Sequence, residues 1–334
     1  MKAIVQCDYG SPDVLKFEAL EKPVPNDNQV LIKVRAASLN FIDAGIMRGP
    51  IPLRLMGTGL RKPKKTMLGQ DVAGEVEAVG KNVTQFKPGD EVFGLARHSL
   101  AEYVCARERA LVIKPANVTF EQAACGGIAA LTALQGLRTG KIQPGQKVLI
   151  NGASGGVGTF AVQMAKSLGA EVTAVCSTSK VDLVRSIGAD HVIDYTKEDF
   201  TKSEQRYDMI YDNVGNHSRA ERSRILTSNG ICVLAGIGSA GVREGQLSRI
   251  GGNFTAFLAS RFSRQKFQMY TTKVKQEDLA VLRDLLATGK VKPVIDRTYK
   301  LREAADGMRY LEEGHARGKV VITVQQDEQT SLSR

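Results

Sequence analysis

The sequence contains no tryptophan and only five cysteines and four histidines among its 334 residues. The cysteines lie far apart and form no C-x-x-C pair, which argues against a disulfide framework and against a zinc site built from thiolates. No H-E-x-x-H motif brings histidines together either. We therefore expect reduced, mostly buried cysteines and no bound metal.

The chain also lacks any run of about 18 apolar residues, so no transmembrane helix is expected. No apolar segment follows Lys2, so no signal or transit peptide is visible and a cytoplasmic location is expected. Global disorder is not expected, because 43% of the residues are hydrophobic, which is enough for ordinary cores. At roughly 100–200 residues per domain, the length predicts two domains.

Positive charge is in excess, with 46 Lys and Arg against 35 Asp and Glu and a formal net charge of +11. Such an excess can indicate binding to nucleic acid or to an anionic membrane. Here the charges are scattered, and the densest run, from Arg61 to Lys65, has no interleaved aromatic residue to stack on bases. The pattern favours a solvated surface that attracts small anionic ligands, and it argues against nucleic acid and membrane partners.

The first 120 residues are typical of a β-rich domain. Short apolar or alternating runs, such as Lys2–Gln6, Val30–Val34 and Asp71–Val79, are separated by turns rich in Gly, Pro, Asn and Asp. This pattern predicts a compact antiparallel barrel or sandwich.

The pattern changes at Thr119, which forms a predicted capping box with Gln122 and should begin a helix that runs to Leu137. Strands then alternate with helices, from the strand at Val148–Ile150 to the strand at Ile231–Ala235. Such alternation predicts an α/β domain with a doubly wound parallel sheet.

A glycine-rich turn follows the strand at Val148–Ile150, where Ala153, Gly155 and Gly158 give the pattern A-x-G-x-x-G. Gly155 allows the backbone to approach a pyrophosphate, Gly158 allows close packing of helix and strand, and the helix N-terminus offers N–H donors. A tight βα turn would explain the glycines alone. Strand, turn, helix and second strand follow within about 30 residues, however, which is the context of a dinucleotide site.

The loop after the next strand indicates which dinucleotide is bound. About 20 residues past the motif, NAD enzymes typically have Asp or Glu for the ribose 2′-OH. This chain has Ser177 and Lys180 there and no acid. A hydroxyl and an ammonium can bind a 2′-phosphate, although an ordinary polar loop would contain the same residues. The missing acid favours NADPH as the cofactor.

From end to end, the chain resembles the medium-chain dehydrogenase/reductase superfamily. The segments that carry the resemblance are 1–17, 36–43, 68–80, 86–93, 153–158, 188–195 and 211–215. The resemblance implies a GroES-like β-rich catalytic domain formed by both chain ends, residues 1–122 and 266–334. A Rossmann NADP-binding domain, residues 123–265, is inserted between them. It also implies a homodimer.

Zinc-dependent members of the superfamily need a Cys, a His-Glu pair and a second Cys. At the matching positions this chain has Asn40, Gln70–Asp71 and Ile128, and Cys125 is displaced from the last of them. Asn, Gln and Ile cannot form a Zn²⁺ site. The chain therefore resembles the zinc-independent quinone oxidoreductase and enone reductase branch.

Without a metal a simple alcohol is hard to activate, whereas a polarised double bond accepts a hydride at its β-carbon and leaves an enolate that positioned donors stabilise. We therefore expect an NADPH-dependent oxidoreductase that transfers hydride to quinones or to the C=C bond of α,β-unsaturated carbonyls. The alternatives are an NAD(P)-dependent alcohol dehydrogenase or carbonyl reductase, and a catalytically idle NADPH-binding protein.

The resemblance places Asn40, through its amide, and Thr132 beside the nicotinamide as the catalytic candidates. Without it, Asn40 would be read as a turn residue at a strand end, and Thr132 as a helix residue. Asp43 is expected to be a structural hydrogen-bonding residue. Since Gly45 stands where the family has a tyrosine, the proton donor is unassigned, and water would serve.

The resemblance also implies the residues that bind the cofactor. At the pyrophosphate it implies Ser154, Gly155, Gly156 and Val157, and at the 2′-phosphate it implies Ser177 and Lys180. Beside the adenosine half it implies Tyr195 and Asn213, and on the nicotinamide side it implies Phe257 and Leu258.

Overall fold

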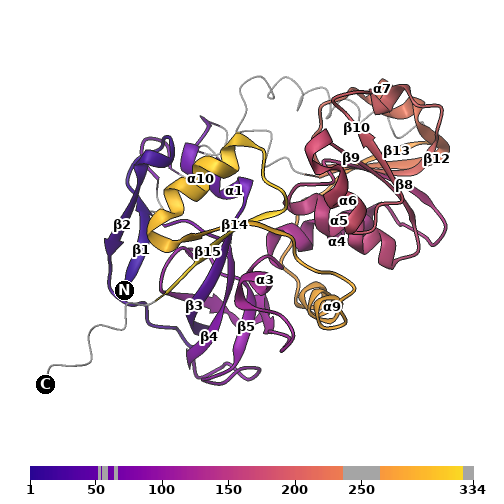
Figure 1. Ribbon diagram of the computed structural model, residues 1–334. Coiled ribbons are helices and arrows are strands. Elements are labelled where there is room, and N and C mark those ends of the chain that lie inside the picture. Colours follow the sequence, from indigo (N-terminus) through magenta and orange to yellow (C-terminus); the bar gives the residue numbers. More distant parts are fainter. Residues whose placement is uncertain (52–53, 55–58, 64–66, 236–263, 326–334) are drawn as a thin grey trace, which may run out of the picture.

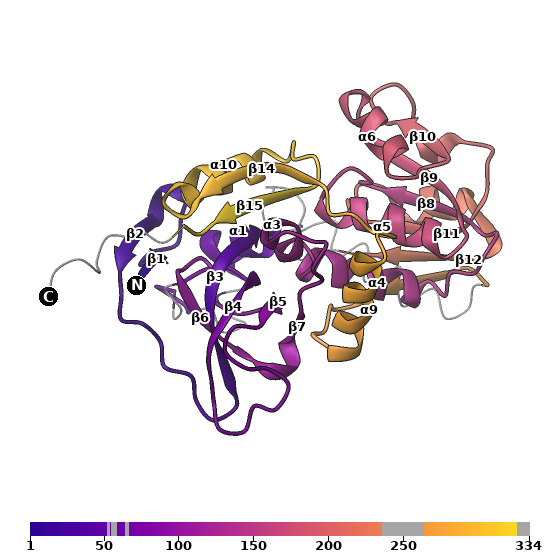
Figure 2. The ribbon, with the colours of Figure 1, turned by 60° about the horizontal axis from the view of Figure 1, so that its bottom comes forward.

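The computed structural model describes residues 1–51, 54, 59–63, 67–235 and 264–325. They form two lobes, one built from both ends of the chain and the other from its middle (Figures 1 and 2). No helix in these ranges is long and apolar enough to cross a membrane.

The lobe of the chain ends contains a seven-stranded sheet in the order β14-β15-β3-β4-β5-β7, with β6 paired to β3, and a separate pair of β1 and β2. The strands are β1 (Lys2–Gln6), β2 (Leu15–Ala19), β3 (Gln29–Leu39), β4 (Asp71–Val79), β5 (Glu91–Leu95), β6 (Tyr103–Arg107), β7 (Leu111–Ile113), β14 (Ile295–Lys300) and β15 (Lys319–Thr323). All pairs are antiparallel except β14 with β15, which agrees with the β-rich, mainly antiparallel start expected from the sequence.

Close approach of β3 and β4 requires a glycine. A Cβ atom at Gly74 would lie only 2.2 Å from the carbonyl oxygen of Lys33. Helix α1 (Phe41–Arg48) follows β3 directly, and α10 (Ala304–Glu313) packs against it and against β14 and β15. The two ends of the chain therefore share one core.

The other lobe is a six-stranded parallel sheet in the order β10-β9-β8-β11-β12-β13. Its strands are β8 (Lys147–Asn151), β9 (Glu171–Cys176), β10 (His191–Asp194), β11 (Tyr207–Asp212), β12 (Leu226–Leu234) and β13 (Lys266–Met269). The predicted doubly wound parallel sheet is confirmed. Because β13 belongs to it, this sheet extends past the domain boundary expected at residue 265.

Both faces of the parallel sheet are buried, since successive residues of a strand point to opposite sides. Val148 and Ile150 join the core that also contains α4 and α5, whereas Leu149 packs with Phe200 and Ile225 on the other face. The other α-helices in the described part of the chain are α3 (Phe120–Ala124), which packs on β3, β4 and β5 of the first lobe, and α4 (Ile128–Thr139), α5 (Gly156–Ser167), α6 (Val181–Ser186), α7 (Arg219–Arg224) and α9 (Gln276–Ala287). Helix α9 contacts both α4 and β7 and so connects the lobes.

The helix expected from Gln122 to Leu137 is interrupted, and that expectation was wrong. The capping box forms, with the Gln122 N–H donating to Thr119 Oγ1 at 3.2 Å, but α3 ends at Ala124 and a new helix begins at Ile128. The cause lies in β4: the Asp71 carboxylate packs where a Cβ atom of Gly127 would be, 2.1 Å from Oδ1. The same oxygen accepts the Ile128 N–H at 2.7 Å and so caps α4 from a neighbouring strand.

Candidate active site

The glycine-rich turn joins β8 to α5 as the sequence predicted. Gly152 has a φ of +78°, and α5 begins at Gly156 with Gly155 as its N-cap. A Cβ atom at Gly158 would lie 2.1 Å from the Gly152 carbonyl oxygen, so only glycine permits this packing of helix on strand.

The turn fits a dinucleotide. A Cβ atom at Gly155 would lie 3.6 Å from the Gly152 carbonyl oxygen, an ordinary van der Waals contact, so the described residues do not crowd this position. The first N–H groups of a helix have no partner within the helix and attract phosphate. Across the turn, Oδ1 of Asn213 is buried without a hydrogen-bond partner. These are features that a bound nucleotide would satisfy.

The predicted cofactor residues gather at one edge of the parallel sheet. Ser154 to Val157 follow β8, whereas Ser177, Tyr195 and Asn213 follow β9, β10 and β11. In the observed strand order, β8 and β11 flank the point where the chain reverses direction across the sheet, which is where dinucleotides bind. The other two predicted residues, Phe257 and Leu258, lie outside the described residues.

A polar cleft of about 530 Å³ lies between the loop after β9 and the C-terminal segment. It is lined by Ser177, Ser179, Lys180, Asp296, Arg297, Tyr310, Glu313, His315 and Arg317. Lys180 Nζ donates to the Ala316 carbonyl oxygen at 3.3 Å, and burial lowers the pKa of Lys180. Asp296 Oδ2 accepts the Tyr310 hydroxyl at 2.6 Å and the Arg317 backbone N–H at 2.8 Å.

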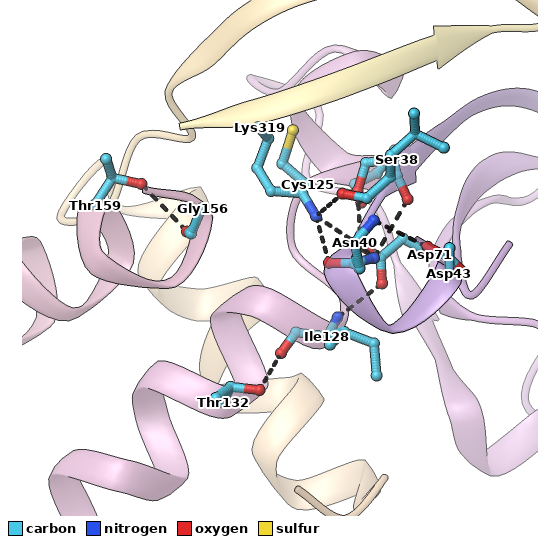
Figure 3. Close-up of polar contacts among 12 residues, drawn as sticks. Ser38, Asn40, Asp43, Asp71, Cys125, Ile128, Thr132, Gly156, Thr159 and Lys319 are labelled. Carbon is cyan, nitrogen blue, oxygen red and sulfur yellow. Dashed lines mark hydrogen bonds and ion pairs between the residues drawn. The ribbon is translucent and has the colours of Figure 1, made fainter. Parts of the chain in front are cut away.

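A second cluster surrounds the side chain of Lys319 at the start of β15 (Figure 3). Its ammonium donates to the Leu39 carbonyl oxygen at 2.9 Å, to Asn40 Oδ1 at 2.6 Å and to Asp71 Oδ2 at 3.2 Å. The Lys319 and Asp71 side chains are 3% and 0% exposed, so this ion pair is shielded from solvent. All three N–H donors of the ammonium have partners.

Asn40 is bonded at both ends of its amide. While Oδ1 accepts from Lys319, Nδ2 donates to Asp71 Oδ2 at 2.8 Å and to the Ser38 carbonyl oxygen at 3.3 Å. The Ser38 hydroxyl donates to the same Asp71 oxygen at 2.6 Å. Asn40 is therefore part of a saturated network formed with residues of β3, β4 and β15, and both its place beside the nicotinamide and its role as an amide donor stay predictions.

The residues at the zinc-ligand positions do not fit a metal. Asn40 and Asp71 surround an ammonium, and Ile128 contributes only its backbone N–H to the cluster. Burial raises the pKa of the nearby Cys125 thiol to about 12, so it is no thiolate at neutral pH. Among the residues that the structure describes, no three His, Cys, Asp or Glu side chains come together.

Asp43 has the structural role expected of it. Its Oδ2 accepts the Asn40 backbone N–H at 2.9 Å and so closes a capping box at the start of α1. Burial, and next the neighbouring Asp71 carboxylate, raise the pKa of Asp43 to about 7.

Thr132 lies on α4 with its hydroxyl directed at the preceding turn (Figure 3). It donates to the Ile128 carbonyl oxygen at 2.7 Å and pairs with the Thr272 hydroxyl at 2.9 Å. Thr272, Lys319 and Arg317 were not predicted from the sequence. Each comes from the C-terminal part of the chain, and its contacts depend on how the lobes pack.

Comparisons with known proteins agree with this architecture. Two protein-family profiles match the sequence, "Alcohol dehydrogenase GroES-like domain" over residues 26–135 and "Zinc-binding dehydrogenase" over residues 187–322. The chain is 36% identical to the 2-methylene-furan-3-one reductase of Solanum lycopersicum and 36% identical to the chloroplastic NADPH-dependent alkenal/one oxidoreductase of Arabidopsis thaliana. Each alignment covers 96% of this chain and 79% of the relative. The structure of the quinone oxidoreductase from Coxiella burnetii superposes with a TM-score of 0.84 at 33% identity, over 97% of this chain and 99% of that one.

Proposed function

The chain belongs to the medium-chain dehydrogenase/reductase family, in its quinone oxidoreductase branch, and we propose that it reduces quinones or the C=C bond of α,β-unsaturated carbonyls with NADPH and without zinc. As a member of this family it is an oxidoreductase that uses a nicotinamide cofactor. The names of two relatives, a furanone reductase and an alkenal/one oxidoreductase, support the proposed substrate class.

The observation that carries the proposal is the Lys319 ammonium bonded to Asn40 and Asp71, two residues at or beside the positions that the resemblance matches to zinc ligands. A cation fixed there repels a second cation, and the surrounding amide, carboxylate and isoleucine do not form a zinc site. Within the described residues of this cluster, all donors of the Lys319 ammonium are already bonded, so this ammonium is not free to acidify the hydroxyl of an alcohol. A conjugated carbonyl or a quinone needs no such help, because its own carbonyl polarises the double bond.

The chain's own residues would perform three tasks. The N-terminus of α5, from Gly156, binds the pyrophosphate and so sets the position of the cofactor, which supplies the hydride when bound. Asn40 and Thr132 line the acceptor side between the lobes. Packing of the lobes around them excludes water from the reacting atoms.

NADPH is the proposed cofactor because the cleft at Ser177 is rich in cations. Lys180, Arg297 and Arg317 line it together with His315, and no carboxylate follows β9 to accept from a ribose 2′-OH. The carboxylate of Asp296 already accepts two hydrogen bonds from the cleft wall. A doubly charged 2′-phosphate would find several donors there.

The test is a panel of quinones, enones, aldehydes and alcohols, assayed by the absorbance of NADPH and by mass spectrometry of the products. The proposal expects enones to gain two hydrogens at the C=C bond and aldehydes to remain unreduced. Oxidation of alcohols alone would favour an alcohol dehydrogenase. Tight NADPH binding without any turnover would favour an idle binding protein. The expected homodimer remains part of the proposal, and light scattering of the purified protein measures it.

A further inference from the structure

The Lys319 side chain spans the distance between the cofactor turn and the Asn40 cluster (Figure 3). Its Cδ atom lies 3.1 Å from where a Cβ atom of Gly156 would be, and its ammonium reaches Asn40 and Asp71. The aliphatic part of this lysine therefore packs on the first residue of α5, while its charge lies in the other lobe.

The backbone that carries this lysine is held tightly. The Gly318 N–H donates to the Ser154 carbonyl oxygen at 2.9 Å, and the Lys319 N–H donates to the Val294 carbonyl oxygen at 2.8 Å. Gly318 has a φ of +97°, and a Cβ atom there would lie 2.3 Å from the same Val294 oxygen. The position of the ammonium is thus fixed by the fold and not by a flexible loop.

The charges around Asn40 allow only one orientation of its amide. Oδ1 faces the Lys319 ammonium at 2.6 Å, and Nδ2 faces the Asp71 carboxylate at 2.8 Å. A half-turn of the amide would place its NH₂ group against the ammonium and its oxygen against the carboxylate. Both contacts would be repulsive, and in a dry site such repulsion is strong.

We propose that Lys319 is a positioning residue for hydride transfer, which locks the Asn40 amide in one orientation beside the acceptor site. This inference rests on the proposed function, because it takes Asn40 as a residue that lines that site. A buried ion pair adds little net stability to a fold, because removing both charges from water costs free energy, and well-packed apolar side chains stabilise a fold as well or better. A lock on a neighbouring amide is a role that an apolar side chain at position 319 would not fill.

The variants separate positioning from stability. Lys319→Met removes the ammonium and keeps most of the aliphatic stem. Because this variant leaves the Asp71 carboxylate buried without its cation, the double variant Lys319→Met/Asp71→Asn restores charge balance if the single one fails to fold. Lys114→Met is the matched control: Lys114 is also a buried lysine of this lobe, and its ammonium donates to the Val118 carbonyl oxygen at 2.7 Å and pairs with Glu91 at 3.0 Å, outside the site.

The kinetic readout is kcat at saturating NADPH with an enone that the wild type reduces, together with the isotope effect for NADPH deuterated at the transferred position. Misplacement of a group by about 1 Å can lower a rate roughly 100-fold, so we expect kcat to fall about 10- to 100-fold in both Lys319 variants. The isotope effect on kcat should rise, because hydride transfer becomes slower than the other steps. Lys114→Met should keep the wild-type kcat and isotope effect. A double variant with wild-type values of both would overturn the inference.

A second readout does not depend on turnover. In protein labelled with ¹⁵N-asparagine, the side-chain amide signal of Asn40, assigned with Asn40→Asp, should exchange slowly with solvent in the wild type and in Lys114→Met. It should exchange faster in the Lys319 variants. Equal exchange in all proteins would show that no lock exists and would overturn the inference. Lack of turnover by the wild type on the whole panel would instead count against the proposed function, so the two failures are distinguishable.

Discussion

Replacement of Lys180 by alanine should weaken the use of NADPH and leave the use of NADH nearly unchanged. The half-buried Lys180 ammonium lines the polar cleft and makes one long hydrogen bond of 3.3 Å to the Ala316 carbonyl oxygen, so donors remain for a phosphate. A hydrogen bond to a charged group contributes roughly 1.5–3 kcal/mol. At about 1.4 kcal/mol per decade, the loss of one such contact predicts a fall of roughly 10- to 150-fold in kcat/KM for NADPH.

The cleft contains further groups that bear on this preference. Arg317 and His315 line it too, so Lys180→Ala should reduce the preference for NADPH without abolishing it. Adding Arg317→Ala should remove most of what remains, although contacts to one phosphate are not additive. Ser177→Asp should reverse the preference, because its carboxylate would repel the phosphate and accept from the ribose hydroxyl.

The assay compares kcat/KM for NADPH and NADH in the wild type and in these variants with one saturating acceptor. Lys197→Ala serves as the control: Lys197 is a largely exposed lysine near the same sheet edge, and it pairs with Asp194 at 3.6 Å outside the lining of the cleft. Equal use of both coenzymes by the wild type would refute the assignment of the 2′-phosphate to this cleft. So would a Lys180→Ala variant that is weakened equally with NADPH and NADH.

Three further predictions concern the cluster between the lobes. Asn40→Ala should lower kcat/KM for enone reduction by roughly 10- to 1000-fold with NADPH affinity nearly intact, and unchanged turnover would leave Asn40 only a structural role. Elemental analysis should find no stoichiometric zinc, and chelators should not affect activity; zinc whose removal abolishes activity would contradict this. The pKa of Asp43 is raised from 3.8 to about 7, mainly by burial, so the folded state keeps a proton that the unfolded state releases. The free energy of unfolding should therefore fall as the pH rises between those two values, and Asp43→Asn should flatten that fall in urea titrations.

The parts of the fold that the sequence predicted well are those with local signals. The predicted strand at Val148–Ile150 lies within the observed β8, because its three apolar side chains are buried on both faces of the parallel sheet. The strands that were missed are short or polar. In β14, Ile295–Lys300, no side chain is fully buried, so neither alternation nor an apolar run marks it, and only its pairing with β15 makes it a strand.

The residues of the candidate site also fall into those with a local sequence signal and those without one. Gly155 and Gly158 could be predicted because turn, helix and strand packing act within a few residues of one another. Lys319 could not, since in the sequence it is only the first residue of a strand, and its three partners are Leu39, Asn40 and Asp71 from the other end of the chain. Likewise, nothing near Arg317 indicates that the loop after β9 will face it across the cleft.

The chemistry of Lys319 itself limits what the cluster can do. A metal ion offers an open coordination position to a substrate oxygen, whereas this ammonium has three donors and all three are occupied. It can orient Asn40, and it can balance the charge of Asp71, but it has no donor left to polarise an alcohol or an unactivated carbonyl. A substrate of such a site therefore needs a reacting double bond that is already polarised, and a conjugated carbonyl polarises the C=C bond in this way. The proposed exclusion of a metal by Lys319 therefore favours an enone or a quinone as the hydride acceptor.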